Sequence, residues 1–115
     1  MTKYNNRKVT TSDGCKHDSK KEALRWMHLK RLESEGKIKD LKRQVEYILI
    51  PKQIESVKGK INTVEKAVIY VADFVYIDTE TNKTVVEDSK GYRTREYIIK
   101  RKLMRYLLGI KIQEI

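Results

Sequence analysis

The sequence predicts a single α/β domain whose elements follow the order helix, three strands, helix, strand. Three observations support this prediction. Residues 68–77 are almost all apolar, β-branched or aromatic, as in a strand that is buried on both faces. Residues 19–35 and 92–108 have the periodicity of amphipathic helices. Residues 110–115 alternate between apolar and polar side chains, as in a short closing strand.

At 115 residues the chain is long enough for one hydrophobic core. Its 26 Lys and Arg residues exceed its 16 acidic residues, which gives a formal net charge of +10 at pH 7. A compact protein with such an excess commonly binds nucleic acid, because its cations attract phosphates. A solvated basic surface without this role is the alternative.

The lone cysteine, Cys15, excludes an intramolecular disulfide and a zinc site built from cysteines. No apolar run is long enough to cross a membrane, and the polar N-terminus has no apolar stretch typical of a signal peptide. We therefore expect a protein of the reducing cytoplasm without a membrane partner. The expected state of Cys15 is a free thiol, since no activating group accompanies it.

Residues 1–18 are polar and basic, and they contain few large apolar side chains. They predict a flexible or loosely packed basic arm that precedes the folded domain of residues 19–115. Two interpretations of this arm are open: it contacts phosphates, or it is simply disordered.

The first helix is predicted for residues 19–35. Ser19 followed by Glu22 has the form of a capping box, and Gly36 is a typical residue at a helix end. Glu22 also falls on the same stripe as Trp26, so it lies at the edge of the apolar face that must pack against the sheet. Its carboxylate can therefore either cap the helix or join a site on the sheet.

Residues 40–50 alternate as a strand whose later half is buried, and Pro51, the only proline, ends it. Residues 52–66 are irregular in pattern, with Gly59 between lysines as a turn. We interpret them as a hairpin that extends the flanking strands. They suggest no chemistry.

Residues 78–83 are polar and suit a turn, and residues 84–86 resume the strand pattern, so an antiparallel hairpin is predicted. Asp73 lies within its first strand, where an ionised carboxylate needs a partner. Alternation puts Asp88 and Lys90 on one face of the second strand. If the register brings Asp73 beside Asp88, these groups can hold a divalent cation and a water molecule.

The second helix is predicted for residues 92–108, with Ile99, Leu103 and either Tyr106 or Leu107 at core spacing. It contains one acid, Glu96, and these cations: Arg93, Arg95, Lys100, Arg101, Lys102 and Arg105. This charge lies next to the proposed site and favours a polyanionic substrate. The alternative is that these cations only solvate one face of the helix and bind no partner.

Residues 18–23 (DSKKEA), 70–74 (YVADF) and 85–91 (VVEDSKG), in this order, resemble the PD-(D/E)XK nuclease superfamily. More narrowly, they resemble a small phage-encoded family, long classed as a domain of unknown function and similar to Holliday junction resolvase-like nucleases. The resemblance covers residues 18–115. It implies a restriction-endonuclease-like core, with a mixed central sheet flanked by helices. It also implies a metal-dependent, structure-selective DNA endonuclease that acts in phage DNA processing.

Carried over residue by residue, the resemblance implies Glu22, Asp73 and Asp88 as ligands of Mg²⁺, for which Mn²⁺ is the expected substitute. It implies Lys90 as the catalytic lysine, beside the three acids. Glu87 precedes Asp88, and a bulged strand would present Glu87 instead, although alternation favours Asp88. Whether one metal ion binds or two is left open.

The cations expected to contact DNA lie in the first block and in the second predicted helix: Lys20, Lys21, Arg93, Arg95, Lys100, Arg101 and Lys102. A junction is cut symmetrically by two active sites, so this activity requires a homodimer. The alternative is a non-catalytic DNA-binding protein on a nuclease-like fold, with the acids and the lysine in an inert buried ion pair. Some tyrosines either stack on exposed bases or pack in the core: Tyr4, Tyr92, Tyr97 and Tyr106.

Overall fold

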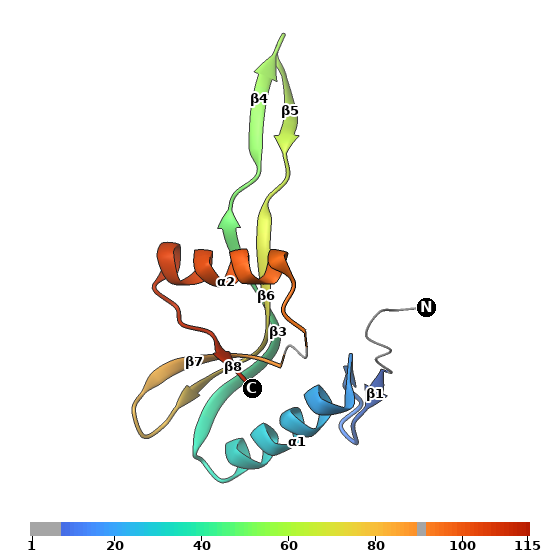
Figure 1. The fold of residues 1–115 in the computed structure, drawn as a ribbon, viewed down its shortest axis with the longest axis vertical. Helices are drawn as coiled ribbons and strands as arrows, with labels where there is room; N and C mark the ends of the chain where they lie inside the picture. The colour runs from blue at the N-terminus through green and yellow to red at the C-terminus, as the bar shows by residue number, and fades with distance from the viewer. Residues whose placement is uncertain (1–7, 90–91) are drawn as a thin grey trace.

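The computed structural model of the protein describes residues 8–89 and 92–115. These residues form two helices and several strands (Figure 1). In chain order they are β1 (Val9–Thr10), β2 (Lys16–His17), α1 (Lys20–Ser34), β3 (Ile38–Ile50), β4 (Gln53–Val57), β5 (Lys60–Glu65), β6 (Val68–Asp78), β7 (Lys83–Asp88), α2 (Arg95–Leu108) and β8 (Gln113–Glu114). No helix in the described ranges is long and apolar enough to span a membrane.

The central sheet is mixed and has the strand order β3-β6-β7-β8. Strand β6 is antiparallel to both β3 and β7, whereas β8 is parallel to β7. A parallel neighbour needs a crossover connection, and α2 supplies it between β7 and β8. The α/β class, the order of the main elements and the predicted β6–β7 hairpin are thus confirmed.

Both helices begin at a side-chain cap. The Ser19 hydroxyl accepts a hydrogen bond from the backbone N–H of Glu22 (3.1 Å), and the Thr94 hydroxyl accepts one from the N–H of Tyr97 (3.0 Å). These bonds satisfy N–H groups that have no partner within the helix. Each helix is followed by a glycine with a left-handed backbone: Gly36 and Gly109. The bounds predicted for the first helix are confirmed, and the second begins three residues later than predicted.

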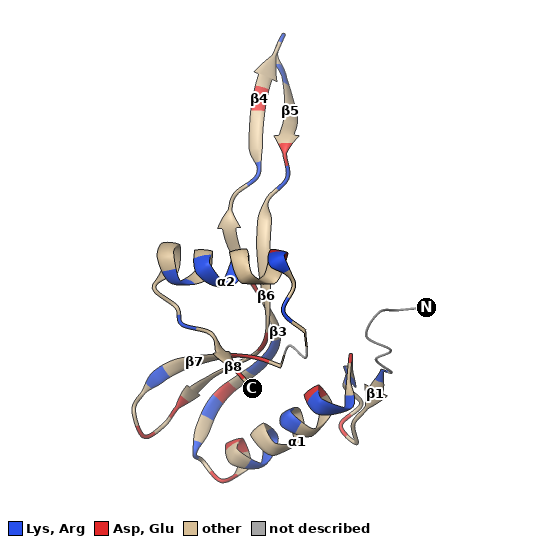
Figure 2. Ribbon diagram, viewed as in Figure 1, with Lys and Arg blue, Asp and Glu red and all other residues tan. Residues whose placement is uncertain are grey.

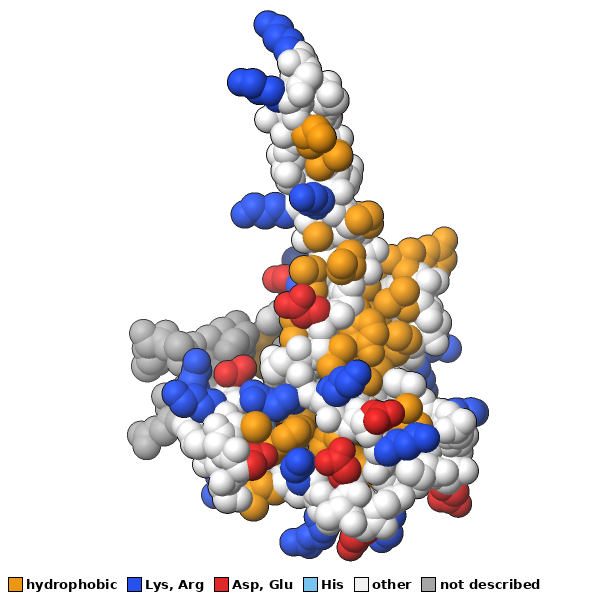
Figure 3. All heavy atoms as spheres, turned by 180° about the vertical axis from the view of Figure 1, so that it is seen from behind, with side chains coloured by type: hydrophobic (Ala, Val, Ile, Leu, Met, Phe, Trp, Pro, Cys, Tyr) orange, Lys and Arg blue, Asp and Glu red, His pale blue; other side chains and the backbone are white. Residues whose placement is uncertain are grey.

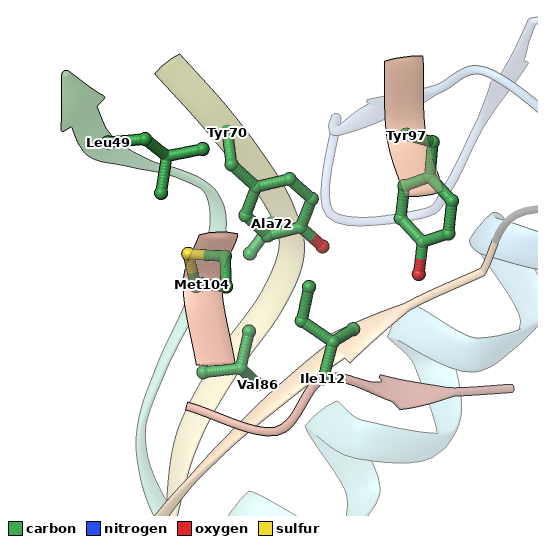
Figure 4. Packing of buried hydrophobic residues seen from close by; sticks show 7 residues of the cluster. All are labelled: Leu49, Tyr70, Ala72, Val86, Tyr97, Met104 and Ile112. Carbon is green, nitrogen blue, oxygen red and sulfur yellow. The ribbon is translucent and has the colours of Figure 1, made fainter. Parts of the chain in front are cut away.

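Two hydrophobic clusters lie on opposite faces of the sheet, because the neighbouring β7 residues Val85 and Val86 contribute to different clusters. The first cluster packs under α2 and is shown in Figure 4; its buried members are Leu49, Tyr70, Ala72, Val86, Tyr97, Met104 and Ile112. The second packs under α1; its buried members are Trp26, Leu29, Ile38, Phe74 and Tyr76.

The face of α2 that packs on the sheet differs from the predicted one. Tyr97 and Met104 are the buried residues of this helix, and Leu103 is half-buried. The other residues predicted for the core are exposed by the following fractions: Ile99 57%, Tyr106 86% and Leu107 46%. Apolar side chains lie on more than one side of α2, so their spacing alone did not identify the face that packs on the sheet.

Residues 8–18 differ from the loosely packed arm that the sequence suggested. They form a short hairpin, β1–β2, that contacts α1. Asp13 in its turn accepts a hydrogen bond from the indole N–H of Trp26 (2.5 Å), and the His17 side chain is buried. Polar contacts rather than apolar residues fasten this hairpin, which is why composition did not reveal it. Residues 1–7 lie outside the described part of the chain.

Arg25 and Glu87 tie α1 to the sheet. The guanidinium of Arg25 donates from Nε to Oε1 of Glu87 (2.8 Å) and from Nη2 to Oε2 (2.7 Å). The Tyr76 hydroxyl donates to the same carboxylate. Since Glu87 is fully buried, this bidentate pair supplies the cation that its charge requires.

Replacing Arg25 with Met should therefore lower the free energy of unfolding by about 3 kcal/mol, because it leaves a buried carboxylate without its cation. Urea denaturation followed by circular dichroism measures this loss. The matched control is Lys37→Met, which breaks an exposed pair with Glu35 (3.5 Å) and should cost less than about 1 kcal/mol. Equal losses in the two variants would contradict this account of the Arg25–Glu87 pair.

Candidate active site

The buried side chains of strand β6 belong to different hydrophobic clusters before and after Asp73. Tyr70 and Ala72, before it, pack in the cluster under α2, whereas Phe74, after it, packs in the cluster under α1. On β3, Gln44 lies between the partners of Ala72 and Phe74, and its φ of 53° is in the left-handed region. Asp73 therefore lies where the strand pair passes from one layer to the other.

Asp73 is fastened to the end of β7. Its Oδ2 accepts hydrogen bonds from both the backbone N–H and the hydroxyl of Ser89, each at 2.8 Å. Because Phe74 pairs with Glu87, the antiparallel register places Asp73 level with Asp88. The expected approach of the two carboxylate-bearing positions is thus present in the fold.

Asp88 is fully buried on the α2 side of β7. Its Oδ2 accepts a hydrogen bond of 2.6 Å from the hydroxyl of Tyr70. Burial, this bond and the charges of Asp88 and Asp73 raise the pKa of Tyr70, so its hydroxyl stays protonated and acts as a donor. Tyr70 thereby links Asp88 to the strand that carries Asp73.

The Glu22 side chain turns toward the sheet. It is 4% exposed, and its Oε1 accepts a hydrogen bond from Nε2 of Gln44 (3.3 Å) and lies 3.7 Å from Nδ1 of His17. Burial, followed by the negative charges of Asp73 and Asp18, raises its pKa from 4.5 to about 7. Ser19 caps the backbone N–H of Glu22, whereas the Glu22 carboxylate is directed toward Gln44 and Asp73 on the sheet.

Three side chains around the acids have no role in the sequence prediction. Gln44 bonds Glu22 from β3, and Tyr70 bonds Asp88 from β6. His17 is buried beside Glu22, and burial and the charge of Arg43 lower its pKa, which favours the neutral imidazole near pH 7. Tyr70 belongs to the YVADF block, which was its only signal. Gln44 could have been noticed only as a polar residue within a strand.

Glu87 does not compete with Asp88 for this site. Its carboxylate is held by Arg25 and Tyr76 on the α1 side of β7, whereas Asp88 lies on the other side. Glu22 and Asp73 interact through their charges, and Asp73 is joined to the chain next to Asp88. In residues 8–89 and 92–115, however, no three His, Cys, Asp or Glu side chains are arranged as a ligand set for a metal ion.

The remaining predicted site residues occupy varied places. Lys90 lies outside the described residues. Several of the expected DNA contacts have protein partners: Lys21 with the carbonyl of Ile115 (2.5 Å), Arg93 and Arg101 with Glu114 (3.0 and 3.3 Å) and Lys100 with Glu96 (2.9 Å). The side chains of the others are exposed: Lys20, Arg95 and Lys102.

The tyrosines divide between packing and exposure. Tyr97, on the buried face of α2, donates a hydrogen bond to Glu114 (2.9 Å), so it packs in the core. Tyr92 and Tyr106 are 51% and 86% exposed, and their surfaces are open to a ligand. Tyr4 lies outside the described residues.

The raised pKa of Glu22 predicts a pH-dependent stability. Because the folded state binds this proton more tightly than the unfolded chain, the contribution is full below about pH 4.5 and is lost as pH rises through about 7. We expect Glu22→Gln to gain on the order of 2 kcal/mol of unfolding free energy, relative to the wild type, between about pH 5 and about pH 8.

Urea denaturation in EDTA at several pH values measures this difference. Glu46→Gln, at an exposed position of β3, is the matched control and should show a constant difference from the wild type. A constant difference for Glu22→Gln as well would refute the assigned environment of Glu22.

Comparison with known proteins identifies a family. The chain matches, over residues 1–112, the model of a family described as a protein of unknown function, DUF1064. No curated protein and no solved structure matches the chain. Since the matched residues cover nearly the whole chain, the protein belongs to the DUF1064 family.

Proposed function

We propose that the protein is a metal-dependent DNA endonuclease with a PD-(D/E)XK, restriction-endonuclease-like core. One observation carries the proposal: acids from three separate elements approach one another, because the charge of Asp73 of β6 acts on Glu22 of α1, and Asp73 also bonds Ser89, directly after Asp88 of β7. The mixed sheet, with one helix before it and one in its crossover, supports the proposal because it has the element order that the resemblance implies.

The chemistry of the acids fits Mg²⁺, with Mn²⁺ as a substitute. Carboxylate oxygens are the ligands that such hard cations prefer. The charge of Asp73 helps to raise the pKa of Glu22, which is the effect of two acids held near each other in a poorly solvated place. A divalent cation would relieve this repulsion. It would share oxygens that accept bonds from Ser89 and Tyr70 in the structure.

In this mechanism Glu22, Asp73 and Asp88 would hold the cation, which when bound would supply an activated water and neutralise charge on the phosphate. Lys90 orients the attacking water or helps to deprotonate it, and it offsets charge that develops on the phosphoryl oxygens. Asp73 has a second task. Through its two bonds it fixes Ser89, the residue that precedes Lys90 in the sequence.

The proposed substrate is branched DNA of a phage, cut in the reducing cytoplasm of the host cell. This part of the proposal follows from the resemblance to Holliday junction resolvase-like nucleases. Symmetric cleavage of a junction requires a homodimer. The proposed DNA contacts remain the cations around the acids: Lys20, Lys21, Arg93, Arg95, Lys100, Arg101 and Lys102.

A second candidate function is non-catalytic DNA binding on the same fold. It is favoured by the absence of a metal-ligand set among the described residues, and by the donors that already bond Oδ2 of Asp73 and Oδ2 of Asp88. In that case the acids stabilise the end of β7 and have no reaction to support.

Cleavage of labelled four-way junction, flap, duplex and single-stranded DNA, with Mg²⁺, Mn²⁺ or EDTA, separates the two candidates. We expect metal-dependent cutting that falls at least about 100-fold in Asp88→Asn and Asp73→Asn, because each variant removes a charged ligand. Binding of the same DNA in EDTA should persist in both variants. The ranking of substrates identifies the preferred DNA structure.

Asp40→Asn is the matched control. Asp40 is exposed, and asparagine tolerates its left-handed backbone (φ 55°), so this variant should keep full activity. Cutting that survives in both Asp73→Asn and Asp88→Asn would overturn the site. Binding without cutting of any substrate by the wild type would favour the non-catalytic function.

A further inference from the structure

Strands β4 and β5 form a ribbon that extends beyond the sheet. Figure 1 shows it continuing from the ends of β3 and β6, away from α1. All residues from 51 to 66 are exposed, and the two strands make their many contacts with each other. An isolated two-stranded ribbon is only marginally stable in water. A surface that lies against the ribbon would therefore contribute to its stability.

One face of this ribbon carries no charge. Ile54 pairs with Thr63 and Ser56 with Ile61, and directly opposite residues lie on the same face. Ile54 and Ile61 are 53% and 71% exposed. Figure 3 shows hydrophobic side chains along the ribbon and around its base. The face thus offers methyl groups and hydroxyls to a partner, and no charged group that would have to be desolvated.

The ends of the ribbon are cationic. Lys58 and Lys60 flank the turn at the tip, and Lys52 and Lys66 flank the base (Figure 2). Left-handed backbones at Lys58 and Gly59 (φ 50° and 76°) form the tight turn that holds the tip lysines. Within the described residues, none of these lysines is within ion-pair distance of an acid. Their charges are thus available to an anionic partner.

We propose that the β4–β5 ribbon is a second DNA-binding element that lies in the major groove. A two-stranded ribbon fits this groove, which is about 12 Å wide. The uncharged face, with Ile54 and Ile61, then lies toward the base edges, where apolar side chains contact thymine methyl groups. Lys58 and Lys60 bind phosphates at the groove edge. The proposal rests on the proposed function for the identity of the polyanion as DNA.

The length of the ribbon fixes where on the DNA it binds. Asp73 and Lys60 are separated by 13 residues of nearly continuous strand, which span at most about 43 Å at ~3.3 Å per residue. One turn of duplex DNA is about 34–36 Å long. If this segment is fully extended, the ribbon tip contacts the duplex about one helical turn from the scissile phosphate, and a duplex of about 10 base pairs (~34 Å) is too short to reach both sites.

Binding in EDTA tests the proposal without any reaction. Fluorescence anisotropy with duplexes of about 10 and about 30 base pairs, at several salt concentrations, gives the affinity and its salt dependence. We expect the double variant Lys58→Gln/Lys60→Gln to lower the slope of log K against log salt by about 1.8 on the long duplex, since two phosphate contacts are lost. On the short duplex the slope should not change.

Two further variants complete the experiment. Lys39→Gln/Lys83→Gln removes the same charge at the opposite end of the sheet, where both residues are exposed, and should keep the wild-type slope. Ile54→Thr/Ile61→Thr keeps β-branched residues and all charges, so it should weaken binding of the long duplex about 10-fold with an unchanged slope.

Equal slopes for the two lysine variants would overturn the proposal. It would also be overturned if Ile54→Thr/Ile61→Thr turned a dimer into a monomer in sedimentation and kept its DNA affinity, because the ribbon would then bind a second copy. If the wild type cuts no DNA but the ribbon variants lose binding as expected, the nuclease proposal fails and the ribbon proposal stands. If the wild type cuts DNA but the ribbon variants bind it as tightly as the wild type, the ribbon proposal fails and the nuclease proposal stands.

Discussion

A carboxylate in the middle of a buried strand constrains the whole centre of this protein. Asp73 cannot be satisfied by the ladder of β6, because ladder bonds engage the backbone and not the side chain. Ser89 supplies two donors just beyond the end of β7. The last residues of β7, and Ser89 directly after them, are thus held against the middle of β6. Without these bonds, a half-buried carboxylate in the strand would lose its two protein donors.

The same position is where the strand pair changes layers. The buried residues Tyr70 and Ala72, before Asp73, belong to the cluster under α2, whereas the buried Phe74 and Tyr76, after it, belong to the cluster under α1. This switch needs an unusual backbone opposite it, which Gln44 provides, and the Gln44 side chain then reaches Glu22. One local irregularity in β3 therefore brings an acid of α1 toward an acid of β6. The network of acids depends on the packing of two layers and not on one motif.

The neighbouring buried acids Glu87 and Asp88 lie on opposite faces of β7 and have different partners. Glu87 is neutralised by a guanidinium with two parallel bonds, an arrangement that joins a helix to a strand. Asp88 points to the other layer, where Tyr70 donates a hydroxyl and the Asp73–Ser89 contact lies alongside. Alternation of side chains along β7 is sufficient to separate the two roles. The alternating pattern in the sequence predicted this division correctly.

Features with a strong local period could be predicted from the sequence, and features set by distant contacts could not. The β6–β7 hairpin and the first helix follow from strand composition, turn residues and a cap. The packed face of α2 does not, because Arg101 lies half-buried toward Glu114 of β8 while the apolar Ile99 faces solvent. Glu22 could be named as a candidate. No local sequence pattern predicts the left-handed backbone of Gln44, whose side chain bonds Glu22.

The pairing of cations changes where a polyanion can bind. Helix α2 is rich in basic residues, yet Arg93 and Arg101 both contact Glu114, and Lys100 contacts Glu96. A cation that already has a carboxylate partner gains less from a phosphate, because it must first give up that contact. The ribbon lysines face no such exchange. The formal charge of +10 therefore overstates the positive charge that is left unpaired around α2.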